Sequence, residues 1–171
     1  MRNKTWVVSD THFGHKLMAN AVDKEGNKIR PWATVEEHDE ALIDGWNALV
    51  NPEDRVYHLG DVAINRKAVA TLGRCHGKVV LIKGNHDIFK LKDYLPFVDD
   101  IRSYRVFNDT AIRMVFSHIP LHESSIERFR YNVHGHVHHN SLADPRYRNV
   151  CVEKTNYVPI ALDQLIAEGV V

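Results

Sequence analysis

The first half of the chain alternates short apolar runs with segments whose apolar positions recur at helical spacing. Three of the runs predict buried strands, over residues 5–9, 55–59 and 78–83. Helices are expected in the segments between and after them, over residues 34–49, 66–74 and 88–95. The first helix has the capping-box pattern Thr34-x-x-Glu37 at its start and Asn51-Pro52 after its end. This half therefore predicts a β-α-β-α-β order with parallel strands.

The pattern changes after residue 100, where strand-like runs follow one another. Two of them, over residues 101–107 and 111–117, flank the turn signal Asn108-Asp109. Further strands are expected at residues 131–133 and 149–152, with a final helix near 161–168. Together the two halves predict an α/β protein with a mixed sheet, or two packed sheets, flanked by helices.

Residues 11–33 show neither the apolar runs of strands nor the apolar spacing of helices. They contain Gly14, Gly26 and Pro31, so they are expected to form a long loop. A loop of this length inside a compact domain is usually functional or mobile. The 171 residues suffice for one domain, over residues 1–171, with a substantial core.

Charge and composition limit which kinds of partner and cellular compartment are expected. Lys+Arg and Asp+Glu are both 22, so the net charge does not indicate a nucleic acid or a membrane surface. No segment approaches the roughly 20 apolar residues of a membrane span. The start, MRNKTWVVSDTH, lacks the apolar region of a signal peptide, and Cys75 and Cys151 cannot form a disulfide framework. A cytoplasmic protein without a membrane partner is expected.

Side chains that bind metal ions follow five of the expected strands. They are Asp10, His12, Asp61, Asn85, His86, Asp87, His118, His136 and His138. In open α/β sheets, sites form outside the carboxyl ends of strands, so these residues are expected to converge. Gly60, Gly84 and Gly135 precede three of them and would allow sharp turns and close backbone approach. Taken alone, Asp10, His12 and Asp61 are better explained as turn or helix-cap residues, and the histidines at 134–139 could be a nonspecific tract. Only the whole set favours a metal site over these explanations.

The types of side chain indicate the chemistry. Imidazole, carboxylate and amide oxygen without thiolate exclude an iron–sulfur or thiolate zinc site, and favour Mn, Fe, Zn, Co or Ni in a catalytic role. Two divalent ions would carry four positive charges, against two negative charges from Asp10 and Asp61. The remaining charge would attract a phosphate group and lower the pKa of a shared water.

The ordered motifs resemble those of the calcineurin-like metallophosphoesterases, in particular the small phage and bacterial members. They are D-x-H at 10–12, G-D at 60–61, G-N-H-D at 84–87, the single histidine at 118 and G-H-x-H at 135–138. The resemblance implies a four-layer α/β/β/α sandwich with two mixed sheets. It also implies hydrolysis of a small phosphate ester at a centre of two divalent ions, with a phosphodiester favoured and Mn²⁺ the first choice of metal over Fe, Zn, Ni or Co.

The same resemblance implies a role for each motif residue. One ion would be held by Asp10, His12, Asp61 and His138, and the other by Asp61, Asn85, His118 and His136. A hydroxide bridging the two ions would be the nucleophile. His86 would protonate the leaving oxygen as general acid, and Asp87 would orient His86.

The motifs indicate the metal ligands, but they say less about substrate contacts and about alternative functions. Arg30, His15 and His122 are the candidates for contacting the substrate, with a solvated loop position as the alternative for each. Residues 101–150 hold seven arginines and no lysine, so nucleic acid stays open as a substrate. The alternatives to a phosphodiesterase are a phosphomonoesterase or nuclease on the same site, or a non-catalytic metal-binding scaffold. Such a scaffold would be expected to have lost His86 or several ligands, and the sequence retains all of them.

Overall fold

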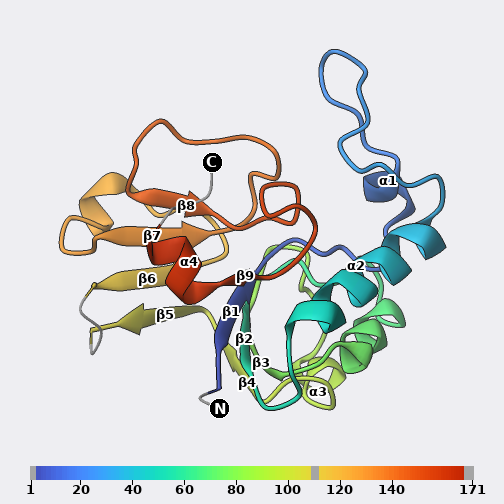
Figure 1. Cartoon of the computed structure of the whole chain (residues 1–171), viewed down its shortest axis with the longest axis horizontal. Coiled ribbons are helices and arrows are strands. Elements are labelled where there is room, and N and C mark those ends of the chain that lie inside the picture. The colour runs from blue at the N-terminus through green and yellow to red at the C-terminus, as the bar shows by residue number, and fades with distance from the viewer. Residues whose placement is uncertain (1–2, 109–111, 168–171) are drawn as a thin grey trace.

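The computed structural model of the chain describes residues 3–108 and 112–167, and Figure 1 shows its two stacked sheets. The strands in these residues are β1 (Thr5–Val8), β2 (Arg55–His58), β3 (Lys78–Ile82), β4 (Asp100–Arg102), β5 (Tyr104–Phe107), β6 (Met114–Ser117), β7 (Tyr131–His134), β8 (Tyr147–Asn149) and β9 (Ile160–Ala161). The α-helices are α1 (Lys16–Ala19), α2 (Val35–Leu49), α3 (Leu91–Tyr94) and α4 (Leu162–Ala167). Two 3₁₀ helices complete the described elements, η1 (Ala68–Arg74) and η2 (Glu123–Ser125).

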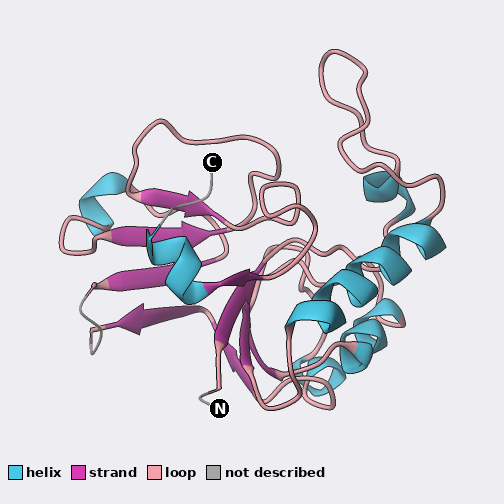
Figure 2. Ribbon diagram, viewed as in Figure 1, coloured by secondary structure: helices cyan, strands magenta, loops and turns pink. Residues whose placement is uncertain are grey.

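Both sheets are mixed, which confirms the expected architecture. The first sheet has the order β4-β3-β2-β1-β9, in which β1 to β4 are parallel and β9 is antiparallel to β1. The second has the order β5-β6-β7-β8, with β5 antiparallel to β6 and the others parallel. Helices α2 and α3, together with η1, lie on one side of the first sheet (Figure 2). The carboxyl ends of the parallel strands are therefore available for a site in each sheet.

Two apolar cores hold these layers together. One lies between the first sheet and the helices and contains Trp46, Leu72 and Leu81. The other lies between the two sheets and contains Leu59 and Phe116. Successive residues of a strand point to opposite faces, so β1 supplies Val8 to the core beside the helices and Val7 to the core between the sheets. This explains why the strands of the first sheet are continuous apolar runs rather than alternating patterns.

The predicted helices form, with one change of type. Thr34 caps α2 and closes the capping box with Glu37, as its sequence indicates. The expected helix at 66–74 is instead the 3₁₀ helix η1, over Ala68–Arg74. Its two buried residues, Val69 and Leu72, are three positions apart. That spacing suits the three residues per turn of a 3₁₀ helix, in which such side chains eclipse one another.

The run at 101–107 is the main difference from the expected strands. It is divided between the two sheets, because β4 pairs with β3 and β5 pairs with β6. Ser103 joins the two strands, so this short connection carries the chain from one sheet to the other. The antiparallel pairing of β5 with β6 confirms the predicted hairpin, although Asp109 of its turn lies outside the described residues.

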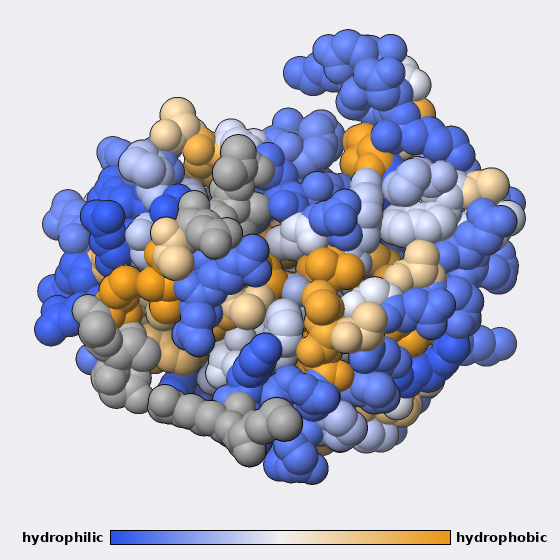
Figure 3. All heavy atoms as spheres, in the orientation of Figure 1, coloured by the Kyte–Doolittle hydropathy of each residue, from blue (hydrophilic) through white to orange (hydrophobic). Residues whose placement is uncertain are grey.

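The long loop predicted at residues 11–33 contains α1 and a polar arm. The arm closes through a bridge between Val22 and Lys28 and projects from the body (Figure 1). Its surface is mostly hydrophilic, in contrast to the apolar patches visible on the body of the molecule (Figure 3). In the described part of the chain, every helix is too short or too polar to cross a membrane.

Candidate metal centre

The polar residues predicted to converge do meet at one edge of the two sheets. The carboxyl ends of β1, β2 and β3 supply residues from the first sheet, and those of β6 and β7 supply residues from the second. Two groups form there, in each of which the candidate ligand atoms lie within 4.8 Å of one another. The first consists of Asp10, His12 and His138, and the second of Asp61, His118 and His136.

Asp61 lies between the two groups. Its Oδ2 is 3.6 Å from His12 Nε2 of the first group and 3.4 Å from His118 Nε2 of its own. Asn85 belongs to the second group, because its Oδ1 lies 2.8 Å from His118 Nε2 and 2.8 Å from His136 Nδ1. All seven predicted ligands therefore surround one pair of adjacent positions.

The Asp10 carboxylate is held on one side and left without a partner on the other. Its Oδ2 accepts hydrogen bonds from the Ser9 hydroxyl, the Cys151 thiol and the backbone N–H of His136. Its Oδ1 and the Nε2 of His12 are buried, and neither has a hydrogen-bond partner among the described residues. Because buried polar atoms are almost always paired, two such atoms 3.8 Å apart fit a cation between them.

Backbone strain is concentrated at the candidate ligands. Five of them have positive φ: Asp10 at 61°, His12 at 49°, Asp61 at 55°, His136 at 72° and His138 at 51°. A non-glycine residue in this region costs about 1–3 kcal/mol, and such residues cluster at functional sites. This backbone conformation interrupts the extended path of each strand, so that the side chains of the candidate ligands can face the shared centre.

The three glycines that precede ligands serve two different needs. Gly60 has φ of 95°, which fits the expectation of a sharp turn. Gly84 and Gly135 are instead needed for close approach. A Cβ on Gly84 would collide with Asp61, and one on Gly135 would collide with Ser9 and Asp10. Small residues thus let the strand ends of both sheets come together around the two aspartates.

The electrostatics of the centre favour bound cations. Burial alone would raise the pKa of the Asp10 carboxyl, but the imidazoles of His12, His118 and His138 lower it instead. The pKa of Asp61 is also lowered, since the neighbouring His118 outweighs the effect of burial. Burial and the adjacent His12 and His86 lower the pKa of His15 to about 4. Both carboxylates are therefore ionised at neutral pH, and His15 is neutral.

Two of the other predicted residues, His86 and His15, lie beside the ligands. The ring of His86 is exposed, and its centroid is 5.4 Å from that of His12. Nδ1 of His15 is 3.4 Å from Nδ1 of His12, so His15 adjoins the first group. Both rings are thus placed where a molecule bound at the metal positions would meet them.

Asp87 has contacts other than those expected. Its carboxylate accepts hydrogen bonds from the backbone N–H groups of Gly84, Asp61 and Val62. None of the described hydrogen bonds joins it to the His86 ring. Asp87 therefore ties the end of β3 to the segment after β2, and these contacts do not support the expectation that it orients His86.

The predicted substrate contacts of Arg30 and His122 are not supported. Arg30 is fully buried and donates to Glu153, to His38 and to the backbone oxygens of Asp10 and Thr11. It has no donor left for a substrate phosphate, so that prediction is wrong. The exposed His122 caps η2 through Ser124 and lies among residues 120–123 and 142–147, outside both groups.

Glu153 is the residue of the centre that the sequence does not reveal. Its buried Oε1 accepts from Arg30 and lies 3.1 Å from Nδ1 of His138. A carboxylate in this position fixes the tautomer of an imidazole whose other nitrogen binds a metal. Glu153 follows no predicted strand and belongs to no motif, so only the way the segment after β8 packs against Arg30 places it there.

We expect the Glu153→Gln variant to bind Mn²⁺ about 10- to 100-fold more weakly at the Asp10–His12–His138 group. The amide keeps an acceptor for Arg30 but removes the charge that favours the metal-binding tautomer of His138. Calorimetric titration of the metal-free protein should show one weakened and one unchanged affinity. Glu53→Gln, in an exposed pair with Lys78, is the control. Two unchanged affinities in Glu153→Gln would contradict the role given to Glu153.

Comparison with known proteins places the chain among phosphoesterases. A family model described as calcineurin-like phosphoesterase matches residues 4–166. An uncharacterised protein of Methanocaldococcus jannaschii is 34% identical over 95% of this chain and 89% of its own length. The Gene 66 protein of Mycobacterium phage L5 is 36% identical, over 50% of this chain and 40% of its own. Among solved structures, a protein of unknown function from Aquifex aeolicus superimposes with a TM-score of 0.76 at 23% identity, covering 96% of this chain and 98% of its own, and supports the fold.

Proposed function

Because this chain belongs to the calcineurin-like phosphoesterase family, we propose that it hydrolyses phosphodiesters at a pair of divalent metal ions, with Mn²⁺ as the expected metal. The observation that carries the proposal is the position of Asp61. Its carboxylate lies between two groups that each converge on a point, as a ligand shared by two adjacent ions would. A dinuclear arrangement of this kind suits in-line displacement at phosphorus.

The described residues supply enough ligand atoms for both ions. Asp10, His12, Asp61 and His138 would bind one, and Asp61, Asn85, His118 and His136 the other. When bound, the two ions supply Lewis-acid polarisation of the phosphoryl oxygens and activation of water. The protein fixes the aspartates through backbone N–H groups, that of His136 for Asp10 and that of His86 for Asp61. The free oxygens are thereby oriented before any ion or substrate arrives.

His86 is the residue best placed to donate a proton to the leaving oxygen. Its backbone N–H is bound to Asp61 at 2.8 Å, while its ring is exposed beside that of His12. A general acid must reach the substrate but keep a fixed position relative to the phosphorus. His86 meets both conditions, and the exposure of Asn85, His86 and His136 leaves the centre open on this side.

The test is a panel of phosphate esters offered to the metal-loaded protein. We expect Mn²⁺-loaded protein to cleave bis-p-nitrophenyl phosphate faster than p-nitrophenyl phosphate, and treatment with EDTA to abolish both activities. Faster cleavage of the monoester would favour a phosphomonoesterase. If the protein bound metal but cleaved none of the esters, the result would favour the alternative of a non-catalytic metal-binding scaffold. Oligonucleotides in the panel test for a nuclease.

A further inference from the structure

A groove of about 880 Å³ begins at the metal centre and runs along the outer face of the second sheet. At one end it is lined by Asn85 and His118, two of the candidate ligands. Its floor is formed by side chains of β5 and β6, including Val106 and Val115, and its roof by residues 119–129. A phosphate held at the metal positions would therefore have one of its ester arms at the mouth of this groove.

The roof of the groove is fixed in place, so the groove exists before ligand binds. The buried Asn132 of β7 accepts from the backbone N–H of Leu121 and donates to the Ser117 hydroxyl. The hydroxyl of Tyr147 donates to the Leu121 carbonyl oxygen at 2.6 Å. Further along the roof, Ile126 is fully buried. Pre-formed clefts with an apolar lining are the usual form of small-molecule sites.

The walls define the chemistry of the arm. Six of the fifteen described lining residues are apolar or aromatic: Tyr104, Val106, Val115, Ile119, Leu121 and Phe129. None of its described lining residues is acidic. Tyr104 and Ile119 are 61% and 50% exposed, an unusual exposure for large apolar groups that a bound arm would cover.

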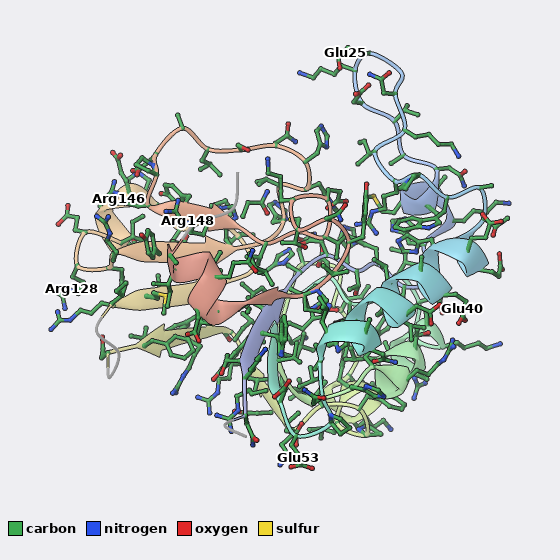
Figure 4. The ribbon with its side chains drawn as sticks, viewed as in Figure 1. Glu25, Glu40, Glu53, Arg128, Arg146 and Arg148 are labelled. Carbon is green, nitrogen blue, oxygen red and sulfur yellow. The ribbon has the colours of Figure 1, made fainter. Side chains whose placement is uncertain are left out.

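Arg128 marks the far end of the groove. β6 runs from Met114 to Ser117, beside His118, and Tyr131 at the start of β7 pairs with Met114. Arg128 precedes Tyr131, so it lies toward the Met114 end of β6, whereas His118 follows the Ser117 end. These two ends of β6 are three residue steps, or roughly 10 Å, apart. Figure 4 shows its side chain extending from the edge of the molecule.

Arg128 is the lining cation that is free to bind an anion. Within the described chain no hydrogen bond or ion pair engages its guanidinium, whereas Arg146 nearby is bound to Asp144. The ammonium group of Lys83, the other lining cation, lies over the Tyr94 ring on the helical side of the first sheet.

We propose that the substrates are phosphate esters with a largely apolar arm, about 10 Å long, that ends in a second anionic group. The arm lies along β5 and β6, and Arg128 binds its terminal carboxylate or phosphate. This inference rests on the proposed function, since the metal centre anchors the ester phosphate.

Calorimetric titration of Mn²⁺-loaded protein with phosphonates tests the groove without requiring turnover. Octylphosphonate should bind at least about tenfold more tightly than methylphosphonate, because its chain leaves water. A carboxylate or a second phosphonate at the chain end should add about threefold to tenfold, and comparison of the two shows which anion the site prefers. Arg128→Gln should remove only this last gain, and Val106→Trp should remove the gain from the chain.

Arg113→Gln is the charge-matched control, since Arg113 lies outside the lining of the groove. Equal affinity for methylphosphonate and octylphosphonate would overturn the proposal, as would an unchanged gain in both groove variants. The same protein is then assayed on the ester panel. Ester hydrolysis without a dependence on chain length would contradict the role of the groove and support the proposed phosphodiesterase activity. A dependence of binding on chain length without hydrolysis would support the groove and contradict the proposed activity.

Discussion

The His86→Ala variant is expected to lose between about 10² and 10⁴ of kcat on esters with a poor leaving group, while both metal ions stay bound. The ring of His86 is exposed beside that of His12, and it belongs to neither group of candidate ligands. Its removal therefore leaves the metal-binding atoms in place. What is lost is the proton that an alkoxide needs in order to leave.

The dependence on the leaving group separates proton donation from simple positioning. A p-nitrophenolate leaves without much help, so the loss on bis-p-nitrophenyl phosphate should be markedly smaller than on an alkyl phosphodiester. Metal content, measured on the same samples, should match that of the unaltered protein. His122→Ala is the matched control, because His122 is exposed and lies outside the centre. An equal loss on both kinds of ester would show that His86 positions the substrate and donates no proton.

The strand-end motifs made most of the centre predictable. Parallel strands place their carboxyl ends along one edge, so any polar residue that directly follows a buried strand is a candidate, as Asp10, Asp61 and Asn85 are. The helix α2 was equally predictable, since its capping box is a local pattern. These features depend on contacts between residues close in sequence or on the direction of the chain.

Features that depend on long-range packing were not predictable in the same way. The run at 101–107 reads as one strand, yet it serves both sheets, because pairing with β3 and β6 decides where each half lies. Asp87 follows His86 in the chain, but its oxygens point to the backbone of another strand end. Adjacency in sequence did not identify the partner of Asp87, since Asp87 is buried whereas His86 is exposed.

Arg30 shows most clearly how burial reverses an assignment made from sequence. In a polar loop that follows the metal-ligand motif D-x-H at 10–12, an arginine suggests a substrate contact. The structure turns it inward, where its guanidinium joins Glu153, His38 of α2 and the backbone after β1. Through Glu153 it also reaches His138, so the loop, the helix and the segment after β8 share one buried network. Arg30 therefore stabilises the centre through its buried contact with Glu153, on the side away from solvent, and does not face the substrate.

We accordingly expect Arg30→Met to lower the free energy of unfolding by about 3–5 kcal/mol, the usual cost of leaving a buried charge without its partner. The carboxylate of Glu153 would lose both hydrogen bonds from Arg30, and two backbone carbonyls would lose theirs. Urea unfolding followed by tryptophan fluorescence measures the change. The titration should be made in EDTA, because metal bound only to the folded state would add its own stabilisation.

A double-mutant cycle shows whether the unpaired charge is the cause. Arg30→Met combined with Glu153→Gln should lower the free energy of unfolding by less than the two single changes added together. The double variant has an uncharged amide in place of the buried carboxylate. Arg74→Met, which removes an exposed arginine from its pair with Glu40, should leave the unfolding midpoint nearly unchanged. If Arg30→Met were as stable as Arg74→Met, the loop would not depend on this network.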